Sequence, residues 1–257
     1  MTSLVKNLLF VLARRGERRI QWSPFYRRFR PRIDVAMIDG RTVISHAFRY
    51  AYFRVPKAAN STIVASLLFS ETGTRISDLN ELQVIKDRRW PHASDLTARQ
   101  LRALLKTYFK FTFVRDPYTR VLAAFLDKIQ RNENEKRNAV NKFLGRPNGA
   151  DVSFEQFLAY LENGGIDHNA HWARQVDLIP VPILALDFIG KMESLSLDLP
   201  HVLTRIFGRR IDACSVTSHS TQATRGHAYW TPDLRGRVYK IYEPDFAAFG
   251  YQRGGEY

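Results

Sequence analysis

Residues 56–62 place one lysine and two hydroxyl side chains between an expected strand and an expected helix. A strand that leads through a short loop into a helix leaves main-chain N–H groups and the positive end of the helix dipole free for an anion. Lys57 adds a positive charge, and Ser61 and Thr62 add hydroxyl donors. The segment therefore predicts a phosphate cradle, with a plain turn and a solvated lysine as the alternative. Its members are Pro56, Lys57, Ala58, Ala59, Asn60, Ser61 and Thr62.

A second expected strand-to-helix turn carries Arg115 and Asp116. Arg115 would extend from the carboxyl end of its strand, the edge where ligands bind in open α/β sheets, and its planar guanidinium suits a phosphate. Asp116 is placed to cap the following helix, and Arg120 lies about one turn further on. Taken alone, this turn leaves open a surface ion pair between Arg115 and Asp116.

Together the two segments resemble the cofactor-binding signature of the sulfotransferases. In that family a lysine loop holds the 5′-phosphosulfate of 3′-phosphoadenosine 5′-phosphosulfate (PAPS), and an Arg-Asp-Pro turn holds the 3′-phosphate. The match is strongest to the Golgi carbohydrate branch, sulfotransferase family 2, which sulfates chondroitin and related glycans. The resemblance implies a PAPS-dependent carbohydrate sulfotransferase that needs no metal.

Further segments resemble the same branch in the same order, so the resemblance runs from about Arg49 to Tyr251, roughly four fifths of the chain. They are 108–117 followed by Arg120, His171-Trp172 followed by Gln175, 187–193, Ser218-His219, and the pattern Tyr239, Tyr242, Asp245, Phe246, Phe249, Gly250 and Tyr251.

The chain departs from the family pattern at two positions after the arginine turn. Where the family carries a serine that contacts the 3′-phosphate, and often a tyrosine two residues later, this chain has Ala123 and Phe125. Losing a hydroxyl contact to a charged group weakens binding by about 1.5–3 kcal/mol if nothing replaces it. Thr119 is placed to compensate, so the predicted cofactor site includes Arg115, Thr119 and position 123.

Two other departures concern the setting of the protein. The Golgi enzymes carry cysteines between the two central segments, whereas this chain has Ile179-Pro180-Val181-Pro182 there, and Cys214 is its single cysteine. One cysteine forms no intramolecular disulfide and fits a reducing compartment. The apolar run 8–13 is far shorter than the ~20 residues that span a bilayer. We therefore expect a soluble, bacterial-type, cytoplasmic relative of the Golgi enzymes.

Sulfo transfer requires alignment of the acceptor oxygen with the sulfur, and stabilisation of charge on the leaving phosphate. Lys57 is the expected catalytic residue for the second task. A base must take the hydroxyl proton. His92 is the first choice, because other sulfotransferase branches place a catalytic His or Glu between the two cofactor motifs. His171 is the second, Glu71 and Glu81 are weaker alternatives, and a solvated loop histidine is the competing interpretation of His92.

Alternating strand and helix patterns predict the elements that position these residues. Strands are expected at 51–55, 109–114 and around 187–190, and helices at 61–68, 98–108, 117–128, 153–161 and 231–242, the last stopped by Pro244. We expect a hydroxyl residue to cap the helix at 61–68, Thr97 to cap the helix at 98–108, and Ser153 and Gln156 to form a capping box. The pattern favours an α/β fold with a P-loop-like parallel β-sheet flanked by helices, the sulfotransferase fold. Phe113 and Phe125 are expected in the core, and Trp172 either in the core or against a sugar.

The chain is basic, with 39 Lys and Arg against 25 Asp and Glu and a net charge of +14 over 257 residues. Residues 1–32 hold nine basic side chains and one acidic side chain, Glu17. We therefore expect a basic N-terminal arm over 1–32, suited to peripheral contact with a membrane, and a single sulfotransferase domain over 33–257.

The sequence leaves other functions open. A carbohydrate acceptor, oligo- or polysaccharide, is the expected partner, and no nucleic acid is expected, because the basic residues gather in the arm rather than in a recognition helix. The alternative is a degenerate sulfotransferase fold that binds glycans or nucleic acid without catalysis. A small-molecule kinase is disfavoured, because the motif G-x-x-x-x-G-K-[ST] is absent.

Overall fold

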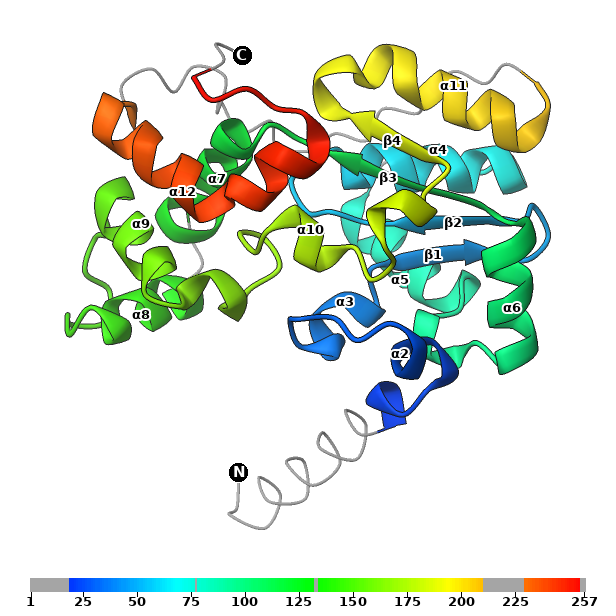
Figure 1. Ribbon diagram of the computed structural model, residues 1–257, viewed down its shortest axis with the longest axis horizontal. Helices are drawn as coiled ribbons and strands as arrows, with labels where there is room; N and C mark the ends of the chain where they lie inside the picture. The colour runs from blue at the N-terminus through cyan, green and yellow to red at the C-terminus, as the bar shows by residue number, and fades with distance from the viewer. Residues whose placement is uncertain (1–18, 77, 132–133, 210–228, 255–257) are drawn as a thin grey trace.

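Alternating side chains of the central strands divide between two hydrophobic clusters, one on each face of a sheet. This computed structural model describes residues 19–76, 78–131, 134–209 and 229–254. In it, Tyr50 and Tyr52 belong to one cluster, and Ala51 and Phe53 belong to the other. A period of two residues is what an extended strand imposes when both of its faces are covered. The expected sheet flanked by helices on both faces is therefore confirmed (Figure 1).

The described sheet has four strands in the order β1-β2-β3-β4. Strands β2, β3 and β4 pair in parallel, and β1 pairs antiparallel with β2 at one edge. The strand expected at 109–114 forms with those bounds, and the strand expected at 51–55 begins and ends earlier. The bounds are β1 Thr42–Ser45, β2 Tyr50–Phe53, β3 Phe109–Val114 and β4 Phe188–Lys191.

Three helices pack on the cluster that contains Tyr50 and Tyr52, and the other cluster is covered by the N-terminal helices and α6. The first group is α4 (Asn60–Thr72), α5 (Leu79–Arg89) and α11 (Leu195–Phe207). The second is α2 (Pro24–Arg28), α3 (Val35–Asp39), η1 (Ala93–Asp95) and α6 (Ala98–Thr107). Thr97 and Gln100 form the capping box of α6, which fixes its expected start.

A helical layer follows the carboxyl end of β3 and lies beside the sheet (Figure 1). Helix α12 packs on α7 and α9 there. The elements are α7 (Pro117–Phe125), the π-helix η2 (Leu126–Gln130), α8 (Asn134–Phe143), α9 (Phe154–Glu162), η3 (Gly165–His168), α10 (Gln175–Leu178), η4 (Ile183–Ala185), η5 (Met192–Ser194) and α12 (Pro232–Phe249). The capping box predicted at Ser153 and Gln156 is present.

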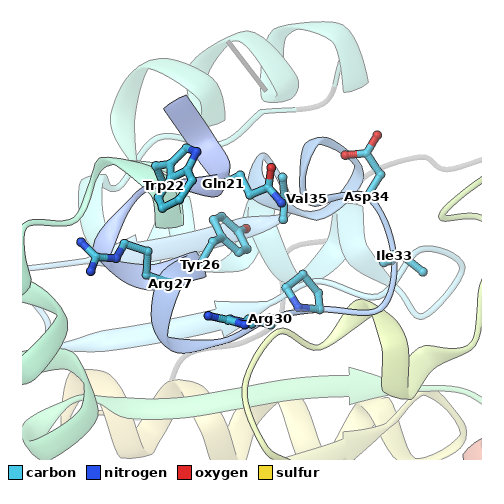
Figure 2. A pocket seen from close by; sticks show the side chains of 9 residues that line it. Gln21, Trp22, Tyr26, Arg27, Arg30, Ile33, Asp34 and Val35 are labelled. Carbon is cyan, nitrogen blue, oxygen red and sulfur yellow. The ribbon is translucent and has the colours of Figure 1, made fainter. Parts of the chain in front are cut away.

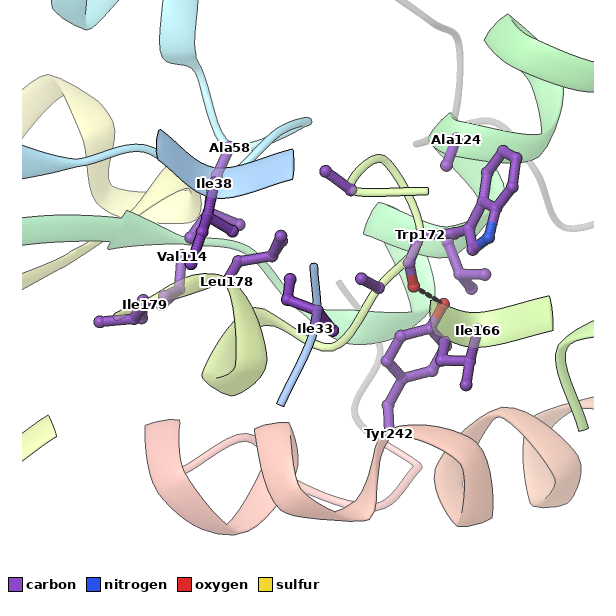
Figure 3. Packing of buried hydrophobic residues seen from close by; sticks show 14 of the residues in the cluster. Ile33, Ile38, Ala58, Val114, Ala124, Ile166, Trp172, Leu178, Ile179 and Tyr242 are labelled. Carbon is purple, nitrogen blue, oxygen red and sulfur yellow. Dashed lines mark hydrogen bonds between the residues drawn. The ribbon is translucent and has the colours of Figure 1, made fainter. Parts of the chain in front are cut away.

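Two expected helices differ from the prediction at their C-terminal ends. The helix expected over 117–128 is α-helical only to Phe125 and then widens into the π-helix η2. The helix expected to stop at Tyr242 continues to Phe249. Tyr242 leaves helical geometry, with φ −109° and ψ 17°, and this kink accommodates Pro244. The kinked position is held in place because the Tyr242 hydroxyl donates to the Trp172 carbonyl at 2.6 Å (Figure 3).

Part of the predicted N-terminal arm packs into the protein. Phe25 and Tyr26 of α2 are 0% and 2% exposed, and both belong to the larger hydrophobic cluster. Ile33 joins the same cluster as Ala58 and Val114 (Figure 3). The described residues from Phe25 onward therefore stabilise the domain, while the boundary predicted at residue 32 stays a prediction.

Candidate functional site

The predicted phosphate loop joins β2 to α4 in a left-handed main-chain conformation. Lys57 and Ala59 have φ values of 69° and 57°, which non-glycine residues rarely adopt and which carry an energetic penalty of about 1–2 kcal/mol each. Ala59 is the N-cap of α4 and no side chain caps the helix, so the expected hydroxyl cap is wrong. The first-turn N–H groups of α4 consequently have no partner from a capping side chain and can bind an anion.

Lys57 forms an ion pair with Asp127 of the π-helix η2. Their side chains are 17% and 26% exposed, and Lys128 Nζ also lies 3.3 Å from Asp127 Oδ2. Burial lowers the pKa of Lys57, with Lys128 and Arg115 adding to this effect and Asp127 opposing it. The pKa of Asp127 is lowered as well, because its contacts with Lys57 and Lys128 outweigh its burial. The lysine is thus partly desolvated and held against a carboxylate.

Arg115 connects its turn directly to the phosphate loop. Its side chain is buried, Nη1 donates to the Lys57 carbonyl at 3.3 Å, and Nε donates to Thr119 Oγ1 at 3.1 Å. Gln175 holds the main chain of Arg115 on both sides, accepting from its N–H at 2.9 Å and donating to its carbonyl at 2.8 Å. Asp116 caps α7 through the Thr119 N–H at 2.8 Å, as expected. The surface ion pair offered as the alternative is not formed, because Arg115 and Asp116 are both buried.

Arg120 is a buried tether between the phosphate loop and the loop that carries His171. Its side chain is 1% exposed and donates to three carbonyl oxygens: Pro56 at 3.0 Å, Ala173 at 2.8 Å and Ala170 at 3.2 Å. No described carboxylate forms a salt bridge with it. A buried guanidinium whose three nitrogens each donate to a main-chain carbonyl positions those segments and offers little to a ligand.

His171 lies within the electrostatic reach of the lysine cluster around the loop. Burial first, and then the positive charges of Arg41, Lys128, Lys57 and Lys136, lower the pKa of His171 to about 2, so the ring is neutral near pH 7. Asn169 Oδ1 accepts from the His171 main-chain N–H at 2.9 Å and lies 2.8 Å from Nδ1. Because that oxygen can only accept, Nδ1 carries the proton and Nε2 keeps its lone pair.

His92, the other predicted base, is held in a different set of contacts. Its Nδ1 lies 3.5 Å from Asp39 Oδ2, which also accepts from the Ser94 hydroxyl at 2.6 Å. The hydrogen bond to Asp39 raises the pKa of His92, although burial opposes it. His92 also begins η1, with its main-chain N–H bound by Asp95 at 3.0 Å. These contacts connect His92 to α3 and η1 rather than to Lys57.

Two partly buried arginines beside the loop were missed in the sequence. Arg54 Nε has no hydrogen-bond partner among the described residues, and burial lowers the pKa of its guanidinium. A cavity of about 190 Å³ is lined by Arg54, Ser61, Gln83, Lys86 and the apolar residues Val64, Leu79 and Leu82. The main-chain carbonyl of Arg41 accepts from the main-chain N–H of Arg54 at 2.9 Å. A charged residue inside an otherwise apolar strand, three positions before Lys57, was the signal for Arg54.

Most of the remaining predicted residues have structural roles. Ala123 and Phe125 are fully buried in the larger cluster, so the Ala123 methyl supplies packing and no polar contact. Glu71 is engaged by Tyr50, Arg89 and Trp90, whereas Glu81 is exposed on α5. Trp172 is 2% exposed and donates to the Gly165 carbonyl at 2.8 Å, so it belongs to the core and not to a sugar-stacking surface. Cys214, Ser218 and His219 lie outside the described residues.

Neither a metal-ligand cluster nor a membrane-spanning helix occurs among the described residues. No cluster of three or more His, Cys, Asp or Glu side chains among them could hold a metal ion. Within the same residues, no helix is both long enough and apolar enough to cross a membrane.

The sheet and its two strand-to-helix turns define an α/β protein in which Arg115 meets the Lys57 loop at one edge of the sheet. The model of the Sulfotransferase family matches residues 40–252, and the chain belongs to that family. It is similar to carbohydrate sulfotransferase 12 of Xenopus laevis, with 28% identity over 64% of this chain and 45% of that protein. Carbohydrate sulfotransferase 14 of Mus musculus is 29% identical over 66% and 49%. Carbohydrate sulfotransferase 10 of Homo sapiens is 28% identical over 63% and 52%.

The chain spans about half the length of the curated relatives that it matches. No solved structure matches it. The predicted family and fold are confirmed.

Proposed function

We propose that this chain transfers a sulfo group from PAPS to a hydroxyl of a carbohydrate. The observation that carries the proposal is the contact between the two motifs, in which Arg115 Nη1 donates to the Lys57 carbonyl at 3.3 Å. It supports a single site that takes both phosphate groups of one nucleotide. The relatives are carbohydrate sulfotransferases by name, which supports a carbohydrate acceptor.

The residues present fit a donor with phosphates at two positions. The uncapped N-terminus of α4 and the side chains of Lys57, Ser61 and Thr62 suit the 5′-phosphosulfate. Arg115 and Thr119 suit the 3′-phosphate, in place of the serine that Ala123 replaces. The unpartnered Arg54 Nε at the neighbouring cavity adds a donor on the side of Ser61.

In the proposed step the acceptor oxygen forms a bond to sulfur as the bond from sulfur to the 5′-phosphate oxygen breaks. The electron pair of the broken bond goes to that phosphate oxygen, and Lys57 stabilises the charge there. His171 Nε2 takes the hydroxyl proton: it carries a lone pair, and the negative charge of the bound donor offsets the positive neighbours that lower the pKa of this ring. His92 remains the alternative base.

Lys57 has to exchange partners in this reaction. It is held by Asp127 in the structure, and a phosphate at the loop would compete with that carboxylate for the ammonium group. Asp127 therefore holds the lysine before the donor arrives, and a bound phosphate has to displace this carboxylate.

The setting is part of the proposal. We place the reaction in the cytoplasm, with peripheral membrane contact through the basic arm, because a single cysteine fits a reducing compartment and the arm carries nine basic residues.

The experiment is a transfer assay with PAPS and a panel of uncharged and uronate-containing oligosaccharides. Chromatography would follow release of 3′-phosphoadenosine 5′-phosphate, and mass spectrometry would detect an added sulfo group on the sugar. We expect one class of sugar to gain the group and the Lys57→Ala variant to lose at least ~100-fold in kcat. Binding of PAPS without transfer to any sugar would instead support the non-catalytic alternative.

A further inference from the structure

The N-terminal segment encloses a cavity that none of the residues assigned above lines. Its volume is about 820 Å³, within the usual range of small-ligand sites. Helix α2 and the chain from Arg30 to Val35 form its walls (Figure 2). The lining residues are Gln21, Trp22, Tyr26, Arg27, Arg30, Pro31, Ile33, Asp34 and Val35.

The lining combines an aromatic surface with arginines that form no salt bridge to a described residue. Trp22 is 70% exposed, an uncommon state for so large an apolar side chain, and it lies near Tyr26 in Figure 2. Arg27 and Arg30 are both exposed, and neither forms a salt bridge with a described residue. Asp34 is the single acid in the lining, and its Oδ1 is engaged by the Ala36 N–H at 2.9 Å. The cavity therefore offers a flat apolar face and exposed guanidinium groups.

Residues of the cavity wall are anchored in the larger hydrophobic cluster. Tyr26 is 2% exposed, and Ile33 shares its hydrophobic cluster with Ala58 of the phosphate loop. The chain then continues through α3 to Arg41, whose charge contributes to lowering the pKa of His171. One short segment thus forms the cavity wall and also supplies a residue to the surroundings of the proposed base.

We propose that this cavity binds an acidic sugar of the carbohydrate acceptor, a uronate, at a position away from the hydroxyl that is sulfated. The inference rests on the proposed function. The C–H face of a pyranose packs on an exposed indole, and a guanidinium pairs with a carboxylate through two parallel hydrogen bonds. A concave site with both groups fits a sugar unit better than a flat lipid surface, on which Trp and Arg side chains would have to protrude.

The test measures binding of a chondroitin hexasaccharide by calorimetry, with the full chain saturated with 3′-phosphoadenosine 5′-phosphate. We expect Trp22→Ala and Arg30→Ala each to weaken hexasaccharide binding by about tenfold, since each loses an exposed contact of about 1.4 kcal/mol. Arg28→Ala is the matched control, because Arg28 is an exposed arginine of α2 that does not line the cavity. It should change binding less than about twofold, allowing for the loss of one screened charge.

A second probe separates sugar packing from charge recognition. The carboxyl-reduced hexasaccharide has the same rings without the acids, so Trp22→Ala should weaken its binding and Arg30→Ala should leave it nearly unchanged. Both variants should keep the nucleotide affinity of the unaltered protein.

The outcomes distinguish this inference from the proposed function. Loss of nucleotide binding by the unaltered protein contradicts the proposed function itself. A different result contradicts only the uronate site: the protein binds the nucleotide, but it does not bind the hexasaccharide, or Trp22→Ala and Arg30→Ala bind the hexasaccharide as tightly as the unaltered protein does. Binding to vesicles containing phosphatidylserine that is lost in Trp22→Ala, without hexasaccharide binding, would make this face a membrane contact and also overturn the inference.

Discussion

Arg115 Nη1 donates a hydrogen bond to the carbonyl oxygen of Lys57 at 3.3 Å, which joins two loops that are 58 positions apart in the chain. Parallel pairing of β2 with β3 makes this contact possible, because it brings the carboxyl ends of both strands to one edge of the sheet. The left-handed conformation of Lys57 accompanies this contact. The account of function depends on this edge, and the following predictions test its parts.

Removing the Arg120 tether should destabilise the fold strongly. Arg120→Ala leaves the carbonyls of Pro56, Ala170 and Ala173 without their buried donor, so we expect the free energy of unfolding to fall by about 3–5 kcal/mol. Urea denaturation measures this change. Arg237→Ala is the matched control, because Arg237 pairs with Glu162 near the surface, and it should cost less than about 1 kcal/mol. Equal effects of the two substitutions would refute a tethering role.

Neutralising Asp127 should tighten nucleotide binding. Asp127→Asn removes the carboxylate that competes with a phosphate for Lys57, and a charge interaction near the surface is worth roughly 1 kcal/mol, or about fivefold in affinity. Calorimetry with 3′-phosphoadenosine 5′-phosphate measures this. Asp151→Asn removes the same charge from a fully exposed side chain and should have no effect. Weaker binding in Asp127→Asn would mean that the carboxylate supports the site instead of competing for it.

The pH dependence of kcat/KM for the donor should distinguish the two histidines. A base must be neutral in the free enzyme, and burial and positive neighbours hold the pKa of His171 at about 2, so catalysis through His171 predicts no loss of activity from pH 8 down to about 5.5. The hydrogen bond to Asp39 raises the pKa of His92 above 6.5, so catalysis through His92 predicts activity that falls as the pH drops through that higher value.

Substitution completes the comparison of the bases. His171→Ala should abolish transfer and leave nucleotide binding in place, whereas His92→Ala should retain transfer. An acid limb above pH 6.5 that disappears in the His92 variant would reverse the assignment.

The sequence was most informative where a short pattern determines local geometry. The strand 109–114, the helix cap at Thr97 and the capping box at Ser153 form as predicted, because alternation of apolar residues and a hydroxyl residue at a helix start are local signals. The pairing of Lys57 with the Arg115 turn followed from the family resemblance and from the rule that parallel strands end at one edge.

Other features depended on contacts that no local pattern contains. Pro244 indicated a helix end, but packing of the Tyr242 hydroxyl on Trp172 supports a kink through which α12 continues. Helix α4 has Ala59 at its N-cap instead of the expected hydroxyl residue, because the left-handed loop leads into the helix without a capping side chain. The contact of Asp127 with Lys57 could not be predicted, because it depends on the π-helix η2, which places Asp127 against that lysine.

Calorimetric titration with 3′-phosphoadenosine 5′-phosphate at moderate salt tests the central claim most directly. We expect micromolar binding, weakened by about 10–100-fold in Lys57→Ala and at least as much in Arg115→Ala, because each removes a charge-assisted contact to phosphate. Lys106→Ala and Arg99→Ala, on the exposed face of α6, are the matched controls and should bind normally, and a circular dichroism melt would check that each variant is folded. An unaltered protein that fails to bind the nucleotide, or variants that bind as tightly as it does, would contradict the proposed site.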